Sequence, residues 1–221
     1  MNDYRCACPS FGGKALFGRT CTEPTTILLY TAPDEGEVAY HVMDSRADNT
    51  DRYLVGHSLR PVAVAYDTTT KTVYWSDVHE RAIHQSKLDG TEHKIFLGYN
   101  HSIGVVDGLV VDARGGRLYY SNMGFVEVES TTYSWHKIES VSLTDPNTDR
   151  RTIVETAERP RGLYIANNKL YYTDWGTHAS VVHVSLDGNN ETVIQTGLDN
   201  PNGVYVNGDK VYVVDSHYKT R

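Results

Sequence analysis

Cysteine is scarce in this sequence and confined to one end. The 221 residues include only 3 cysteines, Cys6, Cys8 and Cys21, and none follows Cys21. Three thiolates with no histidine in the same segment are too few for a tetrahedral zinc site. An odd number of cysteines in a short segment with glycine and proline is typical of part of a disulfide framework. The remaining chain must therefore fold around an ordinary apolar core.

Long apolar runs and an excess of basic charge are also missing. The longest apolar run, residues 105–111, is interrupted by Asp107 and Gly108 and falls well short of the roughly 20 residues of a membrane helix. The first ten residues lack the apolar core of a signal peptide. The formal net charge of -7 argues against nucleic-acid partners. We expect no nucleic-acid binding, and a membrane link only through a transmembrane segment outside this chain.

A tyrosine-rich motif recurs where a helical period is absent. The 16 tyrosines against 4 phenylalanines favour strands, in which an aromatic ring packs and its hydroxyl finds a partner. The motif reads Tyr/Trp-x-Ser/Thr-Asp, and its copies begin at Tyr74, Tyr119, Tyr171 and Tyr212. They are 45, 52 and 41 residues apart. A period of about 40–50 residues is typical of propeller blades.

Each copy lies in a unit that reads as four antiparallel strands. In the third unit we expect strands at 163–165, 170–174, 181–186 and 191–195, with a hairpin turn at Asp187 and Gly188. Residues 27–30 and 38–43 resemble strands of an incomplete blade, and residues 123–135 read as a long loop. The sequence predicts an all-β, six-bladed-type β-propeller, incomplete here, with about three full and two partial four-stranded blades.

The repeated motif is predicted to be scaffold. Its aromatic pair would pack between blades, and its Asp would accept hydrogen bonds from backbone donors of a neighbouring turn. The copies at 119–122 and 212–215 depart from the pattern, since the first ends in Asn122 and the second has Val214 in place of the hydroxyl residue.

These motifs resemble the YWTD, or class B, repeats of the low-density lipoprotein receptor family. The Cys6-Ala7-Cys8 segment followed by Cys21 is similar to the last half of an epidermal-growth-factor-like module. The resemblance implies a half-module at 1–23 and a partial propeller at 24–221. It also implies a disulfide between Cys8 and Cys21, with Cys6 paired to an upstream cysteine that this chain lacks.

The resemblance also implies a function without catalysis and without a cofactor. It is that of an extracellular protein-binding propeller in a lipoprotein-receptor-related endocytic receptor or Wnt co-receptor, as part of a plasma-membrane ectodomain. One alternative is a matrix adaptor like the propeller of nidogen. Asn100 and Asn190 fit the N-glycosylation sequon, which agrees with secretion.

A calcium-dependent lactonase or esterase is a less favoured alternative. The turn at 200–203 resembles one found in such six-bladed enzymes, which hold Ca²⁺ among Glu, Asn and Asp side chains from several blades. Here the inter-blade turns supply Asp107 and Asn202, but the other two offer Arg161 and Val62. A cation beside Arg161 is unfavourable, and no nucleophile motif is present.

Propeller geometry predicts where a secreted protein ligand would bind. Inter-blade loops and the loops after each second strand fall on one face, where an exposed aromatic beside arginine and carboxylates suits a binding hot spot. Trp175 could equally pack between blades. No metal is predicted, because the histidines at 79, 84 and 93 lack ligand spacing. The candidate ligand-binding residues are His79, Glu80, Arg81, Asp107, Arg159, Arg161, Trp175, Asn202 and His217.

Overall fold

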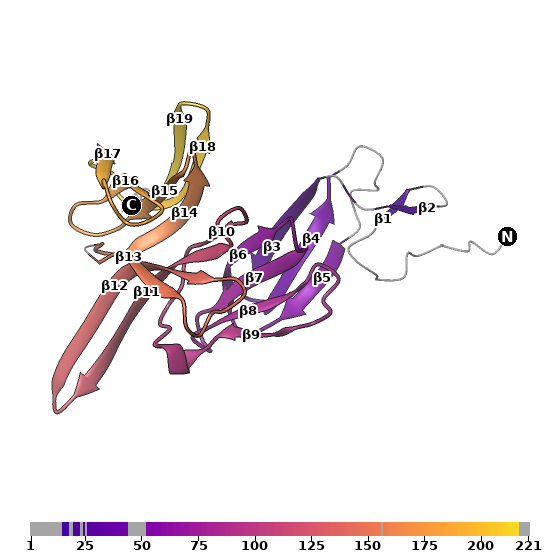
Figure 1. The fold of residues 1–221 in the computed structure, drawn as a ribbon, viewed down its shortest axis with the longest axis horizontal. Helices are drawn as coiled ribbons and strands as arrows, with labels where there is room; N and C mark the ends of the chain where they lie inside the picture. The colour runs from indigo at the N-terminus through magenta and orange to yellow at the C-terminus, as the bar shows by residue number, and fades with distance from the viewer. Residues whose placement is uncertain are drawn as a thin grey trace, which may run out of the picture.

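The computed structural model describes residues 15–17, 20–22, 24, 26–43, 52–155 and 157–216. Over these residues the secondary structure is strands apart from one 3-10 turn, η1 (Tyr99–His101), as Figure 1 shows. A short ribbon of β1 (Ala15–Phe17) and β2 (Thr20–Thr22) precedes the sheets. Cys8, the side chain of Cys21 and the predicted disulfide lie outside what the structure describes.

Five antiparallel sheets follow, each with its strands in sequence order. We number these sheets blades 1 to 5. Blade 1 has β3 (Ile27–Ala32), β4 (Glu37–Val42) and β5 (Arg52–His57). Blade 2 has β6 (Pro61–Asp67), β7 (Thr72–Asp77), β8 (Ala82–Lys87) and β9 (Lys94–Leu97). Blade 3 has β10 (Leu109–Asp112), β11 (Arg117–Val128), β12 (Thr131–Ser142) and β13 (Arg150–Val154).

The remaining two blades complete the series. Blade 4 has β14 (Pro160–Ala166), β15 (Lys169–Asp174), β16 (Ser180–Ser185) and β17 (Thr192–Thr196). Blade 5 has β18 (Pro201–Asn207) and β19 (Lys210–Asp215). Successive first strands β3, β6, β10, β14 and β18 contact one another in that order. Three four-stranded and two smaller sheets, in contact through their first strands, confirm the prediction of an incomplete all-β propeller.

The apolar core lies between the blades, and the aromatic pair of each motif divides between two interfaces. Trp75 is fully buried in a cluster with Val38 and Tyr40 of blade 1. Tyr74 belongs instead to the cluster that blade 2 shares with blade 3. Tyr119 likewise packs between blades 3 and 4. Neighbouring residues of a strand point to opposite faces, so the pair joins each blade to the one before and the one after.

The last residue of the motif ties each second strand to the turn that opens its own blade. Asp77 accepts hydrogen bonds from the backbone N–H of Arg60 at 2.9 Å and of His79 and Glu80 at 2.8 Å. Equivalent bonds run to Asp174 and to Asp215 from the turns before β14 and β18. The prediction that this residue satisfies backbone donors is confirmed.

The hydroxyl before it links successive blades. Ser76 donates to the carbonyl of Val106 at 2.7 Å, and Thr173 donates to the carbonyl of Asn202 at 3.3 Å. Each hydroxyl also accepts from a backbone N–H of its own first strand. The motif is therefore scaffold, because its polar atoms serve the backbone.

Residues 123–135 are not the loop expected from the sequence. β11 and β12 pair without interruption out to Val128 and Thr131, and form the long hairpin that projects from the molecule in Figure 1. The turn residues Glu129 and Ser130 have φ of 48° and 67°, as in two-residue turns of type I′. The alternating apolar residues on both sides of the turn favour strands, and the absence of Asn or Gly at the turn hid the hairpin.

Candidate functional site

Three of the predicted ligand-binding residues form one chain of contacts across three blades. Nη1 of Arg161 lies 2.7 Å from Oδ2 of Asp107, and its guanidinium carbon lies 3.8 Å from the ring centre of Trp175. Trp175 donates from Nε1 to the carbonyl of Pro201 at 2.8 Å. We call Asp107, Arg161 and Trp175 the axial trio. Because Asp107 precedes β10, Arg161 lies in β14 and Pro201 begins β18, the trio connects blades 3, 4 and 5.

Burial sets the electrostatics of the trio. The Asp107 side chain is 11% exposed and that of Arg161 is 29% exposed. Burial raises the pKa of Asp107, and the neighbouring Arg161 charge opposes that rise. Nε of Arg161 is buried and has no hydrogen-bond partner. The pair is therefore partly desolvated, which makes its ionic interaction stronger than that of an ordinary surface pair.

The residues at this position do not fit a calcium centre. A guanidinium occupies the place beside Asp107 where a cation would bind, and like charges repel. Asn202 uses its amide N–H to bond Oγ of Ser216 at 2.7 Å. The carbonyl of Val62 accepts from Thr31 at 2.8 Å. The inter-blade turns thus present a cation of their own in place of a set of oxygen ligands.

A second cluster on the same face surrounds Arg81. Its guanidinium lies 6.0 Å from the ring centre of Tyr99 and 5.9 Å from that of Phe125. Tyr99 is 64% exposed and Phe125 is 54% exposed. Exposed cation–π contacts of this kind contribute about 0.5–1 kcal/mol. Tyr99 was missed from the sequence, although it follows Gly98 in an inter-blade loop where exposed aromatics were expected.

The other predicted ligand-binding residues belong to neither cluster or lie outside the described residues. His79, Glu80 and Arg159 are exposed, Asn202 is half-buried, and His217 lies outside the described residues. The sequence reading also missed Glu158. Its carboxylate accepts from the Thr177 backbone at 2.6 Å and contacts Nδ1 of His178 at 2.8 Å. These bonds lower the pKa of Glu158 and hold the loop that follows Trp175.

The histidines at 84 and 93 come together within blade 2, one in β8 and one just before β9. Nδ1 of His84 lies 3.1 Å from Nε2 of His93, and the Trp75 ring stacks on both imidazoles. On its other side, Nε2 of His84 lies 2.8 Å from Oε2 of Glu80. Burial lowers the pKa of His84, Glu80 opposes this, and His93 adds to it. Burial therefore favours the neutral form of this imidazole.

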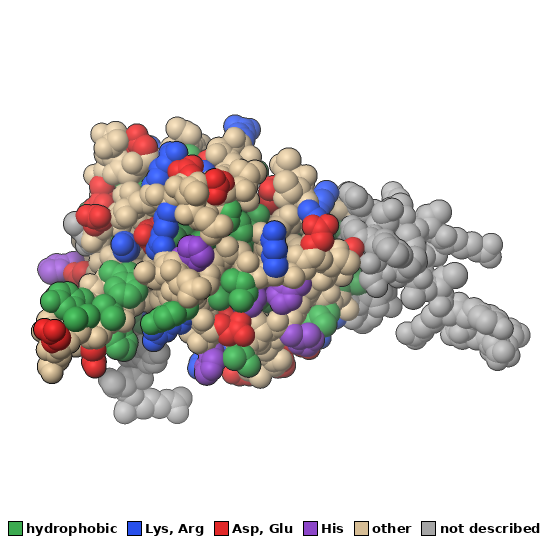
Figure 2. All heavy atoms as spheres, turned by 60° about the horizontal axis from the view of Figure 1, so that its bottom comes forward, with side chains coloured by type: hydrophobic (Ala, Val, Ile, Leu, Met, Phe, Trp, Pro, Cys, Tyr) green, Lys and Arg blue, Asp and Glu red, His purple; other side chains and the backbone are tan. Residues whose placement is uncertain are grey.

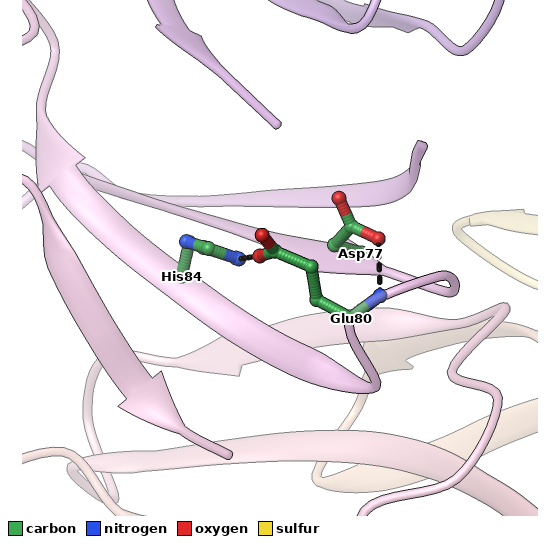
Figure 3. Close-up of side chains that lie close together, drawn as sticks. All are labelled: Asp77, Glu80 and His84. Carbon is green, nitrogen blue, oxygen red and sulfur yellow. Dashed lines mark hydrogen bonds and ion pairs between the residues drawn. The ribbon is translucent and has the colours of Figure 1, made fainter. Parts of the chain in front are cut away.

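Asp77, Glu80 and His84 bring donor atoms within 4.8 Å of one another, and Figure 3 shows the three side chains. The carboxylate of Asp77 already accepts three backbone N–H groups, so it is committed to the turn. Glu80 and His93 contact opposite ring nitrogens of His84. One metal ion bound to a single nitrogen of His84 therefore could not also be bound by both Glu80 and His93. We interpret the cluster as a polar chain that orients the buried imidazole.

No described helix is long and apolar enough to cross a membrane.

A family model described as "SMP-30/Gluconolactonase/LRE-like region" matches residues 61–220, which span blades 2 to 5. The chain belongs to this family. The family match confirms the β-propeller. The family's description also names gluconolactonase, whereas the sequence favours a binding module over a lactonase.

Two relatives in sequence are larger proteins. Protein cueball from Drosophila erecta is 26% identical over 183 residues, covering 80% of this chain and 26% of that protein. Low-density lipoprotein receptor-related protein 5 from Mus musculus is 29% identical over 229 aligned residues, covering 98% of this chain and 13% of that protein. The chain therefore spans about a quarter or less of the length of these relatives.

Two solved structures share the fold at low identity. The crystal structure of a nidogen/laminin complex gives a TM-score of 0.72 at 22% identity, covering 86% of this chain and 69% of the other. A gluconolactonase from Xanthomonas campestris gives 0.67 at 15% identity, with coverage of 86% and 66%. These likenesses show the β-propeller fold.

Proposed function

We propose that this chain is an extracellular, non-enzymatic propeller module that binds a secreted protein ligand on the face formed by the inter-blade loops. The observation that carries the proposal is the axial trio. An aromatic ring, a guanidinium and a carboxylate are fixed together at the junction of three blades. Such pre-organised anchors suit a protein interface, because little conformational freedom is lost on binding.

The Arg81 cluster and the exposed charges nearby extend this face. Arg81, Tyr99 and Phe125 add aromatic and cationic surface, while His79, Glu80 and Arg159 supply a polar rim. A hydrophobic and aromatic centre with a polar rim is the usual anatomy of a protein interface. Asn202 and His217 complete the proposed set of ligand-binding residues.

The receptor setting is the first form of the proposal, and it rests on the relationship to low-density lipoprotein receptor-related protein 5. In this form the chain belongs to an endocytic receptor or a Wnt co-receptor at the plasma membrane. The half-module at 1–23 precedes the propeller at 24–221, Cys8 pairs with Cys21, and Asn100 and Asn190 carry glycans. Both asparagines are exposed, which agrees with that role.

A matrix adaptor is the second candidate, favoured by the fold shared with nidogen in its laminin complex. A calcium-dependent lactonase is disfavoured by Arg161 beside Asp107. Turnover of a lactone panel by the purified chain, dependent on added Ca²⁺ and lost on Asp107→Ala, would overturn the non-enzymatic proposal.

A matched pair of arginine variants tests the binding face. Arg159→Ala removes an exposed cation from the inter-blade loops, and Arg114→Ala removes an exposed cation from the turn between β10 and β11 on the opposite face. We expect a panel of purified secreted proteins, laminin included, to yield a ligand whose affinity falls on Arg159→Ala and not on Arg114→Ala, measured by biolayer interferometry. Equal affinities for both variants would contradict the proposed face.

A further inference from the structure

The outer part of the β11–β12 hairpin exposes apolar side chains. We call residues 123–136 the arm. Phe125, Val126, Val128 and Tyr133 are between 46% and 57% exposed. Figure 2 shows hydrophobic side chains gathered at the left edge of the molecule, beside carboxylates, in the region where the hairpin projects in Figure 1. A contiguous exposed apolar patch of this kind marks an interaction surface more often than it marks ordinary solvent-facing strand.

The register assigns most of this surface to one face of the arm. Val126 lies opposite Tyr133, and Gly124 lies opposite Trp135, so these side chains share a face with Val128. A Cβ at position 124 would lie 2.3 Å from the Trp135 ring, so only glycine lets the ring cover the backbone there. Trp135 also donates to Oδ1 of Asn122 at 3.2 Å. The apolar face therefore starts from an anchored tryptophan and continues to the tip.

The arm also has unpaired edges among the described residues. β13 pairs with β12 only from Ile138 to Val141, so the edge of β12 from Thr131 to Lys137 has no neighbouring strand on that side. A hollow of about 360 Å³ lies along this edge, lined by Ser134, Trp135, His136, Lys137, Glu155 and Ala157. An exposed strand edge with free N–H and C=O groups is a template for an incoming strand.

The hollow continues toward the proposed ligand face. A second hollow is lined by His136, Glu158, Arg159, Gly176 and Thr177, and His136 belongs to both. A segment lying along β12 would therefore extend to Arg159, one of the predicted ligand-binding residues. This continuity links the arm to the face formed by the inter-blade loops.

Charge decides which kind of segment fits. The arm contains Glu127 and Glu129 and no lysine or arginine, and Glu155 lines the hollow. Lys137, the cation at the base, lies 3.6 Å from the carboxylate of Glu139. The chain has a formal net charge of -7, so a second copy would bring like charge to the acidic arm, which disfavours self-association. A basic segment would meet complementary charge.

We propose that the arm binds an extended segment of the protein ligand by strand addition to the free edge of β12. The segment alternates β-branched or aromatic residues with lysine or arginine, so that its apolar side chains pack on Val126, Tyr133 and Trp135. Its basic residues then lie near Glu127, Glu129 and Glu155. This inference rests on the proposed ligand-binding function and names the class of partner.

The test uses a synthetic peptide as the probe, with alternating valine and lysine and blocked ends. Fluorescence anisotropy should show binding to the full chain. A peptide with glutamate in place of lysine, and one with proline at its central positions, should each bind at least ten times more weakly. In hydrogen exchange, the bound probe should protect backbone amides within residues 131–137.

Two variants and a matched control keep the test specific. In the first variant an Asn-Gly turn replaces residues 126–133, which leaves Trp135 and its bond to Asn122 in place. The second is Val126→Thr with Tyr133→Thr. The control, Val193→Thr with Tyr212→Thr, changes equally exposed residues on blades 4 and 5. We expect at least a tenfold loss of probe binding for both arm variants and none for the control.

Several outcomes would overturn the arm proposal. The first is that the variant with the shortened arm binds the probe as tightly as the unmodified chain. The second is that the glutamate peptide binds as tightly as the lysine peptide. The third is that sedimentation shows a dimer of the unmodified chain and a monomer of the variant with the shortened arm. A secreted ligand that is lost on Arg159→Ala but binds the shortened arm normally would refute the arm alone. If instead neither set of variants affects any ligand, the proposed function fails with it.

Discussion

Blades 2 and 3 each have four strands and an aromatic pair in the second strand, yet the motifs in these strands end differently. In blade 2 the final motif residue is Asp77, which only accepts hydrogen bonds. In blade 3 it is Asn122, whose Oδ1 accepts from the Gly104 backbone at 2.8 Å. Its amide donates to the carbonyl of Ser102 at 3.0 Å and to the Glu139 carboxylate at 2.7 Å.

The difference follows from the third-strand residue that pairs with the aromatic residue two positions before the motif's end. Trp75 pairs with His84 in blade 2, and Tyr120 pairs with Glu139 in blade 3. Glu139 is 3% exposed and bonds Arg150 through both carboxylate oxygens, at 3.1 and 2.5 Å. A second carboxylate beside it would be repelled, so an amide replaces the aspartate. Whether the motif ends in aspartate or asparagine therefore depends on whether the neighbouring strand places a carboxylate beside it.

The largest expected effect concerns the aromatic position that both blades share. Trp75→Ala removes a fully buried side chain between blades 1 and 2, and such truncations cost about 3–5 kcal/mol. Urea unfolding of the variant should show this loss. Tyr120→Phe in blade 3 keeps the ring and serves as the conservative comparison. A loss below that of Tyr120→Phe would show that the Trp75 cluster does not hold blade 1.

Exchanging the last motif residue sharpens the comparison. Asn122→Asp places a carboxylate 2.7 Å from that of Glu139 and should destabilise the fold by about 3 kcal/mol. Asp77→Asn keeps an acceptor for the backbone donors and should cost about 1–2 kcal/mol. Urea denaturation of both variants gives the two values. If Asp77→Asn were the more damaging, the account of the blade 3 ending would be wrong.

The stability of the chain should depend on pH through a buried histidine in blade 2. Burial keeps the pKa of His84 below its ordinary 6.5, whereas the unfolded chain takes up a proton near that value. Because the unfolded state then binds more protons, stability falls as pH drops below about 6.5, by about 1 kcal/mol between pH 7.5 and 5.5.

A variant that lacks only the His84 imidazole isolates that contribution. His84→Gln should reduce the loss of unfolding free energy between pH 7.5 and 5.5. Part of the loss should remain, because burial also lowers the pKa of His183 and Lys169 adds to the effect. An unchanged loss in His84→Gln would mean that folding does not lower the pKa of this imidazole.

The smallest effect is expected for the feature in which the two blades differ most visibly. Replacing residues 126–133 by Asn-Gly removes only exposed residues of blade 3, so unfolding free energy should change by less than about 0.5 kcal/mol. Thermal unfolding followed by circular dichroism measures this. A large loss of stability would give the arm a structural role and weaken its assignment to ligand binding.

Local sequence signals were enough to locate most strands and to predict that the repeated motif is scaffold. Alternation of apolar residues marked the second and third strands, and Asp-Gly turns marked the hairpins, because both depend on neighbours in sequence. Gly90 and Gly188 do have positive φ, of 81° and 90°. The arm shows the limit: its alternation was visible, but a turn of Glu129 and Ser130 carries no hairpin signature.

The sequence by itself determined most of the strands, the blade period and the packing of the aromatic pair between blades, since each follows from local geometry and burial. Only the tertiary structure decided which distant residues meet. Arg161 contacts Asp107 and Ser76 contacts Val106, each across a blade boundary. Gly90 faces the backbone of Val55 in the preceding blade, where a Cβ would lie 2.9 Å from its carbonyl oxygen. Such contacts depend on how each blade packs on the next, which no local pattern specifies.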